Sequence, residues 1–280
     1  MKKLSLGFSP CPNDTFIFDA LIHHKIDTEG LEFDVFFDDV ETLNRKALQG
    51  VLDITKLSFH AFAHVSDKYV LLDAGSALGF GVGPLLISKT AYTPEEVQRQ
   101  SSLSVGIPGT YTTANFLLGL AFPELQNKKE LMFSAIEESL LNEELNLGVI
   151  IHENRFTYAQ KGLHKVMDLG DYWEQETGMP IPLGGIVIKR NIDTETQHTV
   201  NRLIRKSVEY AFEHPEASSD FVRKHAQELD ESVRKQHIDL YVNKYCINLG
   251  DLGKKAIRVF FEKGQSVGLI STSTEKLFLT

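Results

Sequence analysis

The sequence predicts an α/β fold made of two alternating blocks of strands and helices, followed by a helical C-terminal segment. Short apolar runs with strand character alternate with helix-like runs up to about residue 151, and the connections between them are short. That pattern is typical of βαβ units around a largely parallel sheet. Beyond Arg190, helix-like segments follow one another with few strands between them. Two blocks and a helical tail fit a bilobed ligand-binding architecture, with a single doubly wound sheet as the competing interpretation.

The first block alternates strands with helices as far as residue 88. Strands are expected at residues 4–8, 31–37, 51–55, 69–73 and 85–88, and helices at residues 14–24, 41–49 and 59–67. The glycine-rich segment at residues 75–84 lacks the Gly-Lys-Ser/Thr ending of a phosphate loop and opens no obvious helix. We therefore expect a plain loop or hinge there.

The second block and the tail complete the expected order of elements. Strands are expected at residues 104–107, 131–133, 147–151 and 185–189, a further apolar run at 166–169, and helices at 112–121 and 135–142. The tail is expected to form helices at residues 194–213, 215–227, 231–241 and 251–263. The chain would cross between lobes near residues 88–93 and return near 180–185. Lobe one would then be residues 1–88 with 186–280, lobe two residues 89–185, and the ligand cleft would lie between them.

Composition narrows the class of partner. The 280 residues are 42% hydrophobic and 24% charged, which is ordinary for a globular protein with a sizeable core. A formal net charge of −9 argues against nucleic acid or an anionic membrane as partner, because both require a basic face. Two cysteines, no secretory signal and no membrane-length apolar run indicate a reduced, cytoplasmic protein without membrane insertion. The acidic surface and the helical tail permit a homodimer.

The segment Ser9-Pro10-Cys11-Pro12-Asn13-Asp14-Thr15-Phe16 follows the first expected strand. Its two prolines make a stiff turn, and Asn13 or Asp14 offers an N-cap for the helix that follows. Exposed amides at a helix start can hold an anion, whereas the plainer interpretation is a capped turn.

Two more expected strand ends lead into helices that begin with hydroxyl residues. Ser58 precedes the helix at 59–67, and Thr112 with Thr113 begins the helix at 112–121. Ligands of open α/β sheets bind at such carboxyl edges, where helix starts supply N–H groups and partial positive charge. Lys56 adds a formal cation. We therefore expect a small ligand with a carboxylate, while simple capping remains the alternative.

His152 ends the apolar run at residues 147–151, so a parallel sheet would direct it toward the cleft. Its side chain titrates near neutral pH and can act as a general base, and Glu153 and Arg155 follow closely enough to orient it. A structural histidine is the alternative interpretation. His60 and His64 are four residues apart on one expected helix, but the sequence places no third metal ligand beside them, so packed or solvated histidines are favoured.

Aromatic residues that could stack on a flat ligand are also present, although core packing explains most aromatic side chains. They are Tyr111, Phe156, Tyr158 and Trp173.

The octapeptide at residues 9–16 resembles the signature of the 1,4-dihydroxy-6-naphthoate synthase family, the lyases of the futalosine route to menaquinone. Further segments match that family in the order in which it carries them. They are Thr55-Lys56-Leu57-Ser58, Gly109-Thr110-Tyr111-Thr112-Thr113-Ala114, Gly148-Val149-Ile150-Ile151-His152-Glu153, Arg155-Phe156-Thr157-Tyr158 and Pro180-Ile181-Pro182-Leu183-Gly184-Gly185.

The resemblance implies a bilobed fold similar to type II periplasmic binding proteins, with two mixed or parallel sheets flanked by helices. It implies a cofactor-independent carbon–carbon lyase that converts cyclic dehypoxanthinyl futalosine to 1,4-dihydroxy-6-naphthoate and releases the sugar-derived fragment. In the family, the histidine that matches His152 is regarded as the catalytic base.

In the family, the segments that match Lys56-Leu57-Ser58 and Thr113-Ala114 contact the substrate. Together with the turns at the strand ends, this predicts the residues that bind an aromatic carboxylate, with no metal ligand among them. They are expected to be Pro10, Cys11, Asn13, Asp14, Thr15, Lys56, Leu57, Ser58, Thr112, Thr113 and Ala114. Two alternatives remain: a chorismate dehydratase of the sister family in the same pathway, and a solute-binding protein for a small carboxylate.

Overall fold

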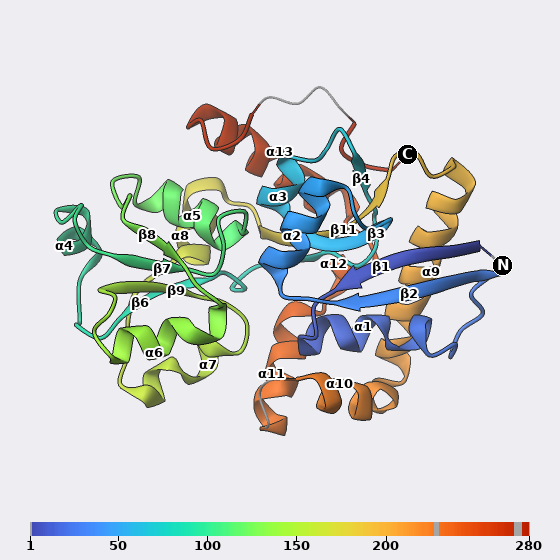
Figure 1. The fold of residues 1–280 in the computed structure, drawn as a ribbon, viewed down its shortest axis with the longest axis horizontal. Helices are drawn as coiled ribbons and strands as arrows, with labels where there is room; N and C mark the ends of the chain where they lie inside the picture. The colour runs from blue at the N-terminus through green and yellow to red at the C-terminus, as the bar shows by residue number, and fades with distance from the viewer. Residues whose placement is uncertain (1, 227–229, 272–275, 280) are drawn as a thin grey trace.

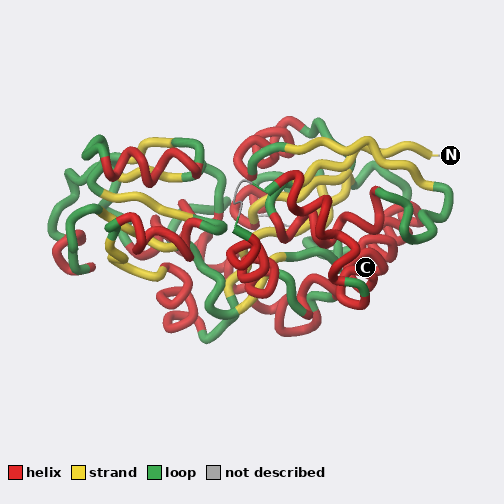
Figure 2. Tube along the Cα trace, turned by 90° about the horizontal axis from the view of Figure 1, so that it is seen from below, coloured by secondary structure: helices red, strands yellow, loops and turns green. Residues whose placement is uncertain are grey.

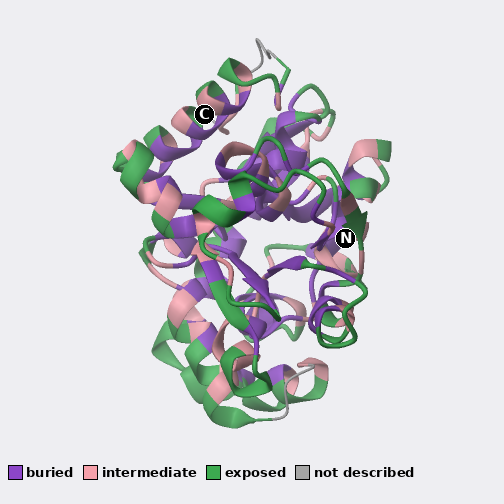
Figure 3. Ribbon diagram, turned by 90° about the vertical axis from the view of Figure 1, so that its left-hand side faces the viewer, coloured by how far each residue is buried: buried purple, intermediate pink, exposed green. Residues whose placement is uncertain are grey.

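The computed structural model describes residues 2–226, 230–271 and 276–279, which form two lobes lying side by side, each built on its own sheet (Figure 1). Both chain ends lie on the same lobe. Figure 2 shows helices on both sides of the strands, and in Figure 3 the strands at the centre are buried while outer helix faces and loops are exposed. The competing interpretation, a single doubly wound sheet, is wrong.

The first lobe has a six-stranded mixed sheet in the order β2-β1-β3-β11-β4, with β5 also pairing with β11. β1 is parallel to β2 and β3, whereas β11 is antiparallel to β3, β4 and β5. The strands are β1 (Lys2–Phe8), β2 (Leu31–Phe37), β3 (Ile54–Ser58), β4 (Tyr69–Leu71), β5 (Ala77–Gly79) and β11 (Ile181–Lys189).

Alternate residues of this sheet enter two different cores, as the two-residue period of a strand requires. On β11, Ile186 and Ile188 pack in the core that α1 shares with α9, while Val187 lies in the core that contains α3 and α13. The helices of this lobe are α1 (Pro12–Ile22), α2 (Val40–Gln49), α3 (Phe59–Ala63), α9 (Thr194–Glu213), α10 (Ser219–His225), α11 (Glu231–Tyr241), α12 (Lys244–Ile247) and α13 (Gly250–Ser266).

The second lobe has a five-stranded mixed sheet in the order β10-β6-β9-β7-β8. The strands are β6 (Leu85–Ser88), β7 (Val105–Ile107), β8 (Lys128–Glu130), β9 (Leu147–Ile150) and β10 (His164–Asp168). β7 is parallel to β8 and β9, and β6 is antiparallel to β9 and β10. The helices are α4 (Pro94–Gln98), α5 (Thr113–Ala121), α6 (Ile136–Leu141), α7 (Asn154–Thr157) and α8 (Leu169–Thr177).

One apolar core continues from one lobe into the other. Phe260 of α13 lies 4.0 Å from Phe116 of α5 and 5.7 Å from Trp173 of α8, measured between ring centroids. All three rings are buried, so the lobes share a packed apolar contact along this side.

The two sheets place both boundaries between the lobes at other residues than expected. The strand Leu85–Ser88, expected in lobe one, pairs with β9 and β10 in the five-stranded sheet. The chain therefore crosses at residues 80–84, between β5 and β6. On the return, β11 begins at Ile181, so an edge at 185/186 would divide a continuous strand. A buried apolar strand has the same local sequence whichever sheet it joins, which is why the pattern could not place it.

Several expected elements differ in detail. The strand expected at 51–55 is observed at Ile54–Ser58, and the strand expected at 131–133 is replaced by β8 and a 3₁₀ turn, Phe133–Ala135. The glycine-rich loop contains the short strand β5. The sheets are mixed rather than largely parallel. The helix expected at 215–227 is a 3₁₀ turn followed by α10, and residue 227 lies outside the described residues.

Candidate functional site

The turn after β1 begins α1 earlier than expected. Cys11, in extended conformation, is the N-cap residue, and Pro12 occupies the first helical position, where no backbone N–H is needed. Asn13 and Asp14 therefore lie inside the first turn and do not cap it, so the expected Asn13 or Asp14 cap is wrong. Their side chains are instead available to make contacts with other elements.

Asp14 is the centre of a buried polar cluster. Its Oδ2 accepts hydrogen bonds from the Ser9 backbone N–H and hydroxyl, at 3.3 and 2.8 Å, and its Oδ1 accepts one from the Asn13 amide at 2.9 Å. Lys56 Nζ lies 2.8 Å from the same Oδ1 and donates to the Gly75 carbonyl at 3.2 Å. The Lys56 charge is thus opposed by Asp14, so Lys56 does not present the unopposed cation expected from the sequence.

Ser58 is both the last residue of β3 and the N-cap residue of α3, but its hydroxyl does not cap the helix. The Asn44 side chain of α2 contacts it twice instead: its Nδ2 donates to Ser58 Oγ at 3.2 Å, and its Oδ1 accepts from the Ser58 N–H at 2.9 Å. Asn44 thereby determines the direction of the Ser58 hydroxyl.

Thr112 caps α5 as expected, accepting a hydrogen bond from the Asn115 N–H at 3.2 Å and donating to the Gly109 carbonyl at 2.7 Å. The Thr113 hydroxyl donates to the Leu183 carbonyl at 2.7 Å. Because Leu183 belongs to β11 of the first lobe, this hydrogen bond joins the two lobes.

His152 follows β9 with a positive φ of 57°, a conformation that non-glycine residues seldom adopt and that is often retained at functional sites. Burial lowers the pKa of His152 below its usual 6.5, while the nearby Glu153 carboxylate acts in the opposite direction. Its Nε2 lies 3.9 Å from the Cys11 sulfur, and its ring meets Phe133 edge-on at 5.0 Å. Burial raises the pKa of the Cys11 thiol, which is therefore not a ready nucleophile.

Two cavities meet at His152. The first, of about 110 Å³, lies between the lobes, and the second, of about 240 Å³, lies on the Cys11 side. The expected site residues that line the first cavity are Asn13, Asp14, Lys56, Leu57, Ser58, Thr112, Thr113, Ala114 and His152. Pro10 and Cys11 line the second cavity, together with His152. The starts of α1, α3 and α5 therefore converge on one place.

Some expected residues lie elsewhere. Thr15 lines neither cavity; its hydroxyl donates to the Cys11 and Pro12 carbonyls within α1. The candidate stacking residues Tyr111, Phe156, Tyr158 and Trp173 also line neither cavity. His60 packs against Phe116 at 5.4 Å between ring centroids, and burial lowers its pKa to about 4.

The structure adds residues that sequence reasoning missed. Glu153 lines the second cavity, Tyr241 of α11 lines the first, and His237, one turn before Tyr241, stacks on His152. The four-residue spacing of His237 and Tyr241 shows that they share one helix face, but it does not show against what that face packs.

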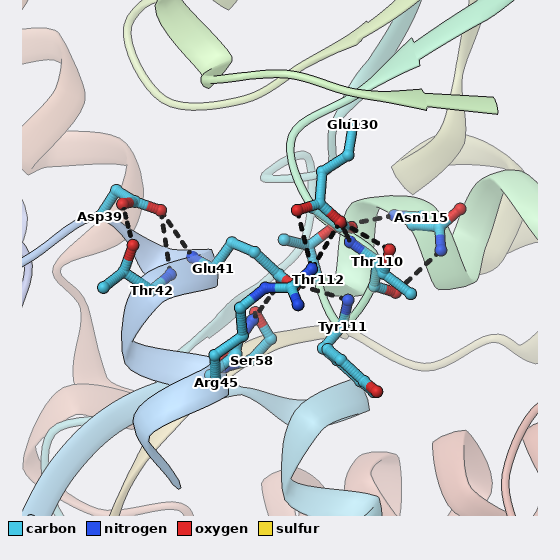
Figure 4. Close-up of polar contacts among 12 residues, drawn as sticks. Asp39, Glu41, Thr42, Arg45, Ser58, Thr110, Tyr111, Thr112, Asn115 and Glu130 are labelled. Carbon is cyan, nitrogen blue, oxygen red and sulfur yellow. Dashed lines mark hydrogen bonds and ion pairs between the residues drawn. The ribbon is translucent and has the colours of Figure 1, made fainter. Parts of the chain in front are cut away.

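The lobes also meet through a polar cluster that we call the inter-lobe clasp, formed by Glu41, Arg45, Thr110, Tyr111 and Glu130 (Figure 4). Arg45 Nη2 contacts both Glu130 oxygens at 2.8 and 2.9 Å, and the Thr110 N–H and hydroxyl donate to Glu130. The Tyr111 N–H donates to Glu41 at 3.1 Å. Burial raises the pKa of Glu41 to about 7, and the nearby Glu130 charge adds to the effect.

Next to the clasp, the backbone of Gly109 lies close against the Glu41 side chain. A side-chain Cβ at this position would lie 2.5 Å from Glu41 Oε2, and φ there is +153°. Glycine is therefore required for the loop to reach α2.

Within the described ranges, no three His, Cys, Asp or Glu side chains are grouped to hold a metal ion. None of the described helices combines the length and apolar character that crossing a membrane requires.

Comparison with known proteins connects this site to one family. The model of a family described by "Menaquinone biosynthesis" matches residues 4–266. The 1,4-dihydroxy-6-naphthoate synthase of Thermus thermophilus is 42% identical over 279 residues, covering 100% of both chains. The enzyme of the same name from Streptomyces coelicolor is 38% identical and covers 95% of this chain and 94% of its own.

Solved structures agree with the fold. A protein from Archaeoglobus fulgidus superposes with a TM-score of 0.90 at 35% identity, covering 96% of this chain and 98% of its own. The alkanesulfonate-binding protein of Xanthomonas axonopodis superposes with a TM-score of 0.72 at 11% identity, covering 97% of this chain and 95% of its own. The expected periplasmic-binding-protein-like fold is thus confirmed.

Proposed function

Because the chain belongs to the menaquinone biosynthesis family, as a 1,4-dihydroxy-6-naphthoate synthase and hence a lyase, we propose that His152 is the general base of its reaction. The substrate in this proposal is cyclic dehypoxanthinyl futalosine, and the products are 1,4-dihydroxy-6-naphthoate and the sugar-derived fragment. His152 removes a proton from the substrate, the carbon–carbon link to the fragment breaks, and formation of the aromatic ring favours the cleavage.

The position and state of His152 carry this proposal. It lies in the wall common to both cavities, so a substrate that spans them places its scissile link beside the imidazole. Burial keeps the imidazole neutral near pH 7, because the desolvated cation is unfavourable, and a neutral imidazole can accept a proton. His152 keeps an unfavourable positive φ of 57°, which requires that the surrounding structure hold it in that position.

The carboxylate of the substrate is proposed to bind where Ser58, Thr112, Thr113 and Ala114 line the first cavity. The hydroxyls of Thr112 and Thr113 already donate to backbone carbonyls. The donors proposed for the carboxylate are therefore the Ser58 hydroxyl, which accepts from Asn44, and the unsatisfied N–H groups in the first turn of α5.

Lys56 contributes in a different way from the sequence expectation. Paired with Asp14, it orders the turn that carries Pro10, Cys11 and Asn13 beside His152. We propose that Leu57, with Leu43 and Leu183, packs on the apolar ring of the substrate, because all three line the first cavity.

The test is to incubate the purified protein with cyclic dehypoxanthinyl futalosine and to follow the aromatic product by absorbance and mass spectrometry. His152→Ala is expected to lower kcat by at least ~10²-fold. His164→Ala, which changes an exposed histidine of β10, is the matched control and should keep full turnover. Equal turnover by His152→Ala and wild type would remove His152 from the proposal. Turnover of chorismate instead would favour the sister dehydratase.

A further inference from the structure

His237 is a fully buried histidine of α11 that the proposed function does not use. Its ring lies 5.9 Å from the His152 ring, centroid to centroid, and the planes are only 14° apart. It lines neither cavity, so it stands behind His152 as seen from the ligand. Burial moves its pKa well below 6.5, and the neighbouring His152 adds to this.

The tautomer of His237 follows from its neighbours. Asn13 donates its amide N–H to Asp14, an acceptor, so the oxygen of the Asn13 amide is the atom that faces His237. His237 Nε2, 2.9 Å from that oxygen, must then carry the hydrogen. The neutral ring therefore has its lone pair on Nδ1.

That lone pair faces an acid. His237 Nδ1 lies 3.7 Å from Glu153 Oε2, and both atoms are buried without a hydrogen-bond partner. A lone pair opposite a carboxylate oxygen is unfavourable, whereas one proton between the two atoms makes a charge-assisted hydrogen bond. The pair is thus built to hold a single proton.

The cations near Glu153 are already paired with other carboxylates, so none of them neutralises Glu153 in place of that proton. Asp14 is paired with Lys56, and Arg155 lies 3.2 Å from Asp168. Among the described residues, Glu153 forms no ion pair with a Lys or Arg, and its contact with His237 is with a neutral ring. The titratable groups that face the pair are Cys11, on which the Glu153 charge acts, His152, which stacks on His237, and Tyr241, whose ring lies 4.7 Å from the His237 ring. Asp14, Asp39 and Lys56 act on His152, and Arg155 acts on Tyr241.

We propose that Glu153 is the general acid that complements His152, and that His237 is the positioning residue that keeps a proton on it. The inference rests on the proposed function. Glu153 lines the second cavity, where the departing fragment would lie, whereas His237 lines neither cavity and adjoins the second one through Glu153 and His152.

The step balances without a further reactant. His152 removes a proton from the substrate, and the electron pair left behind completes the aromatic ring. The carbon–carbon bond breaks with its electron pair on the sugar-derived fragment, and Glu153 donates the shared proton to that fragment. The proton on His152 then restores the Glu153–His237 pair, so no net proton is gained or lost.

Glu153→Gln tests the acid, because the amide keeps the shape but cannot donate an acidic proton. We expect kcat to fall by ~10²-fold with KM nearly unchanged. A wild-type kcat in Glu153→Gln would overturn the assignment.

Two substitutions of His237 distinguish its role as acceptor for the Glu153 proton from its role in packing. His237→Asn can present its side-chain oxygen where Nδ1 was, while His237→Gln reproduces the donor toward Asn13 instead. His237→Gln removes the acceptor that faces Glu153, so it should lower kcat toward the value of Glu153→Gln with KM nearly unchanged. His237→Asn keeps an acceptor there and should keep kcat near the wild-type value. An equal fall of kcat in both variants would indicate packing alone and overturn the role of His237.

A measurement on the free protein is independent of activity. In ¹⁵N spectra of the histidine rings, the His237 signal is the one missing from His237→Asn, and its Nδ1 should show a hydrogen-bonded position that is lost in Glu153→Ala. An unchanged Nδ1 signal would refute the shared proton. Absence of product with wild-type protein would instead refute the proposed function, and the spectra would still decide whether the pair holds a proton.

Discussion

Replacing Arg45 by alanine is expected to raise KM about two- to fivefold with little change in kcat. Arg45 of α2 contacts both oxygens of Glu130 across the lobes, at 2.8 and 2.9 Å. The two side chains are 49% and 37% exposed, so solvent screening limits the pair to about 0.5–1 kcal/mol. We call the form in which the two lobes meet at the clasp the closed form. At 1.36 kcal/mol for each factor of ten, that free energy corresponds to a two- to fivefold change in the population of the closed form.

The effect should appear in KM because the closed form places residues of both lobes around the first cavity, while the clasp itself does not contact the reacting atoms. Kinetics of wild type, Arg45→Ala, Glu130→Gln and the double variant form a double-mutant cycle that isolates the pair. Arg45→Lys is the matched control, since it keeps the charge but loses the paired N–H donors. At about 1 M salt, where screening acts over roughly 3 Å, the variants should converge. A coupling energy of zero would refute the role of the clasp in closure.

Three further outcomes follow from the structure. Thr113→Val should lower the free energy of unfolding by about 1–3 kcal/mol, since it leaves the Leu183 carbonyl without its donor, whereas Thr113→Ser should not; urea denaturation measures both. The rise of kcat/KM with pH should have its midpoint below 6.5, because burial lowers the pKa of His152 and only its neutral form accepts a proton, and a midpoint above 6.5 would contradict this. Hydrogen bonds from Arg202 and Lys206 lower the pKa of Glu29 to about 2. The stability that Glu29 contributes is therefore complete above about pH 4.5 and is lost as the pH falls toward 2. In acid titrations, Arg202→Gln should lose less stability over this range than wild type.

Much of the fold could be predicted because its signals are local. The helices at residues 194–213 and 231–241 have the bounds that the pattern predicted, and Asp193 and Asp230 cap them as short polar residues before a periodic run should. The strands at 31–37 and 85–88 were equally clear.

The sequence did not predict in the same way which sheet each strand joins. The strand Leu85–Ser88 pairs with β9 and β10 in the second sheet. Its own sequence does not indicate with which strands it pairs. The three-residue strand β8 was missed because an exposed edge strand of sequence Lys128-Lys129-Glu130 has no apolar pattern.

The residues of the candidate site were predictable where their position is local to one element, and their contacts with other elements were not. Residues next to a strand end, such as Ser58, Thr112 and His152, were found because the chain itself places them at the carboxyl edge of a sheet. The sequence also determined that these segments carry the family motifs. It could not show that Lys56 is neutralised by Asp14, because that ion pair joins β3 to α1.

The sequence by itself therefore determined the alternating elements, the family and a histidine at the end of β9. Only the tertiary structure decided what surrounds that histidine: Cys11 from the first turn, Phe133 from the second lobe, and His237 with its lone pair toward Glu153. The physical reason is that hydrogen bonding and burial within a helix or strand act between near neighbours in the chain. The charge state of a buried group depends instead on side chains that packing brings together from distant elements.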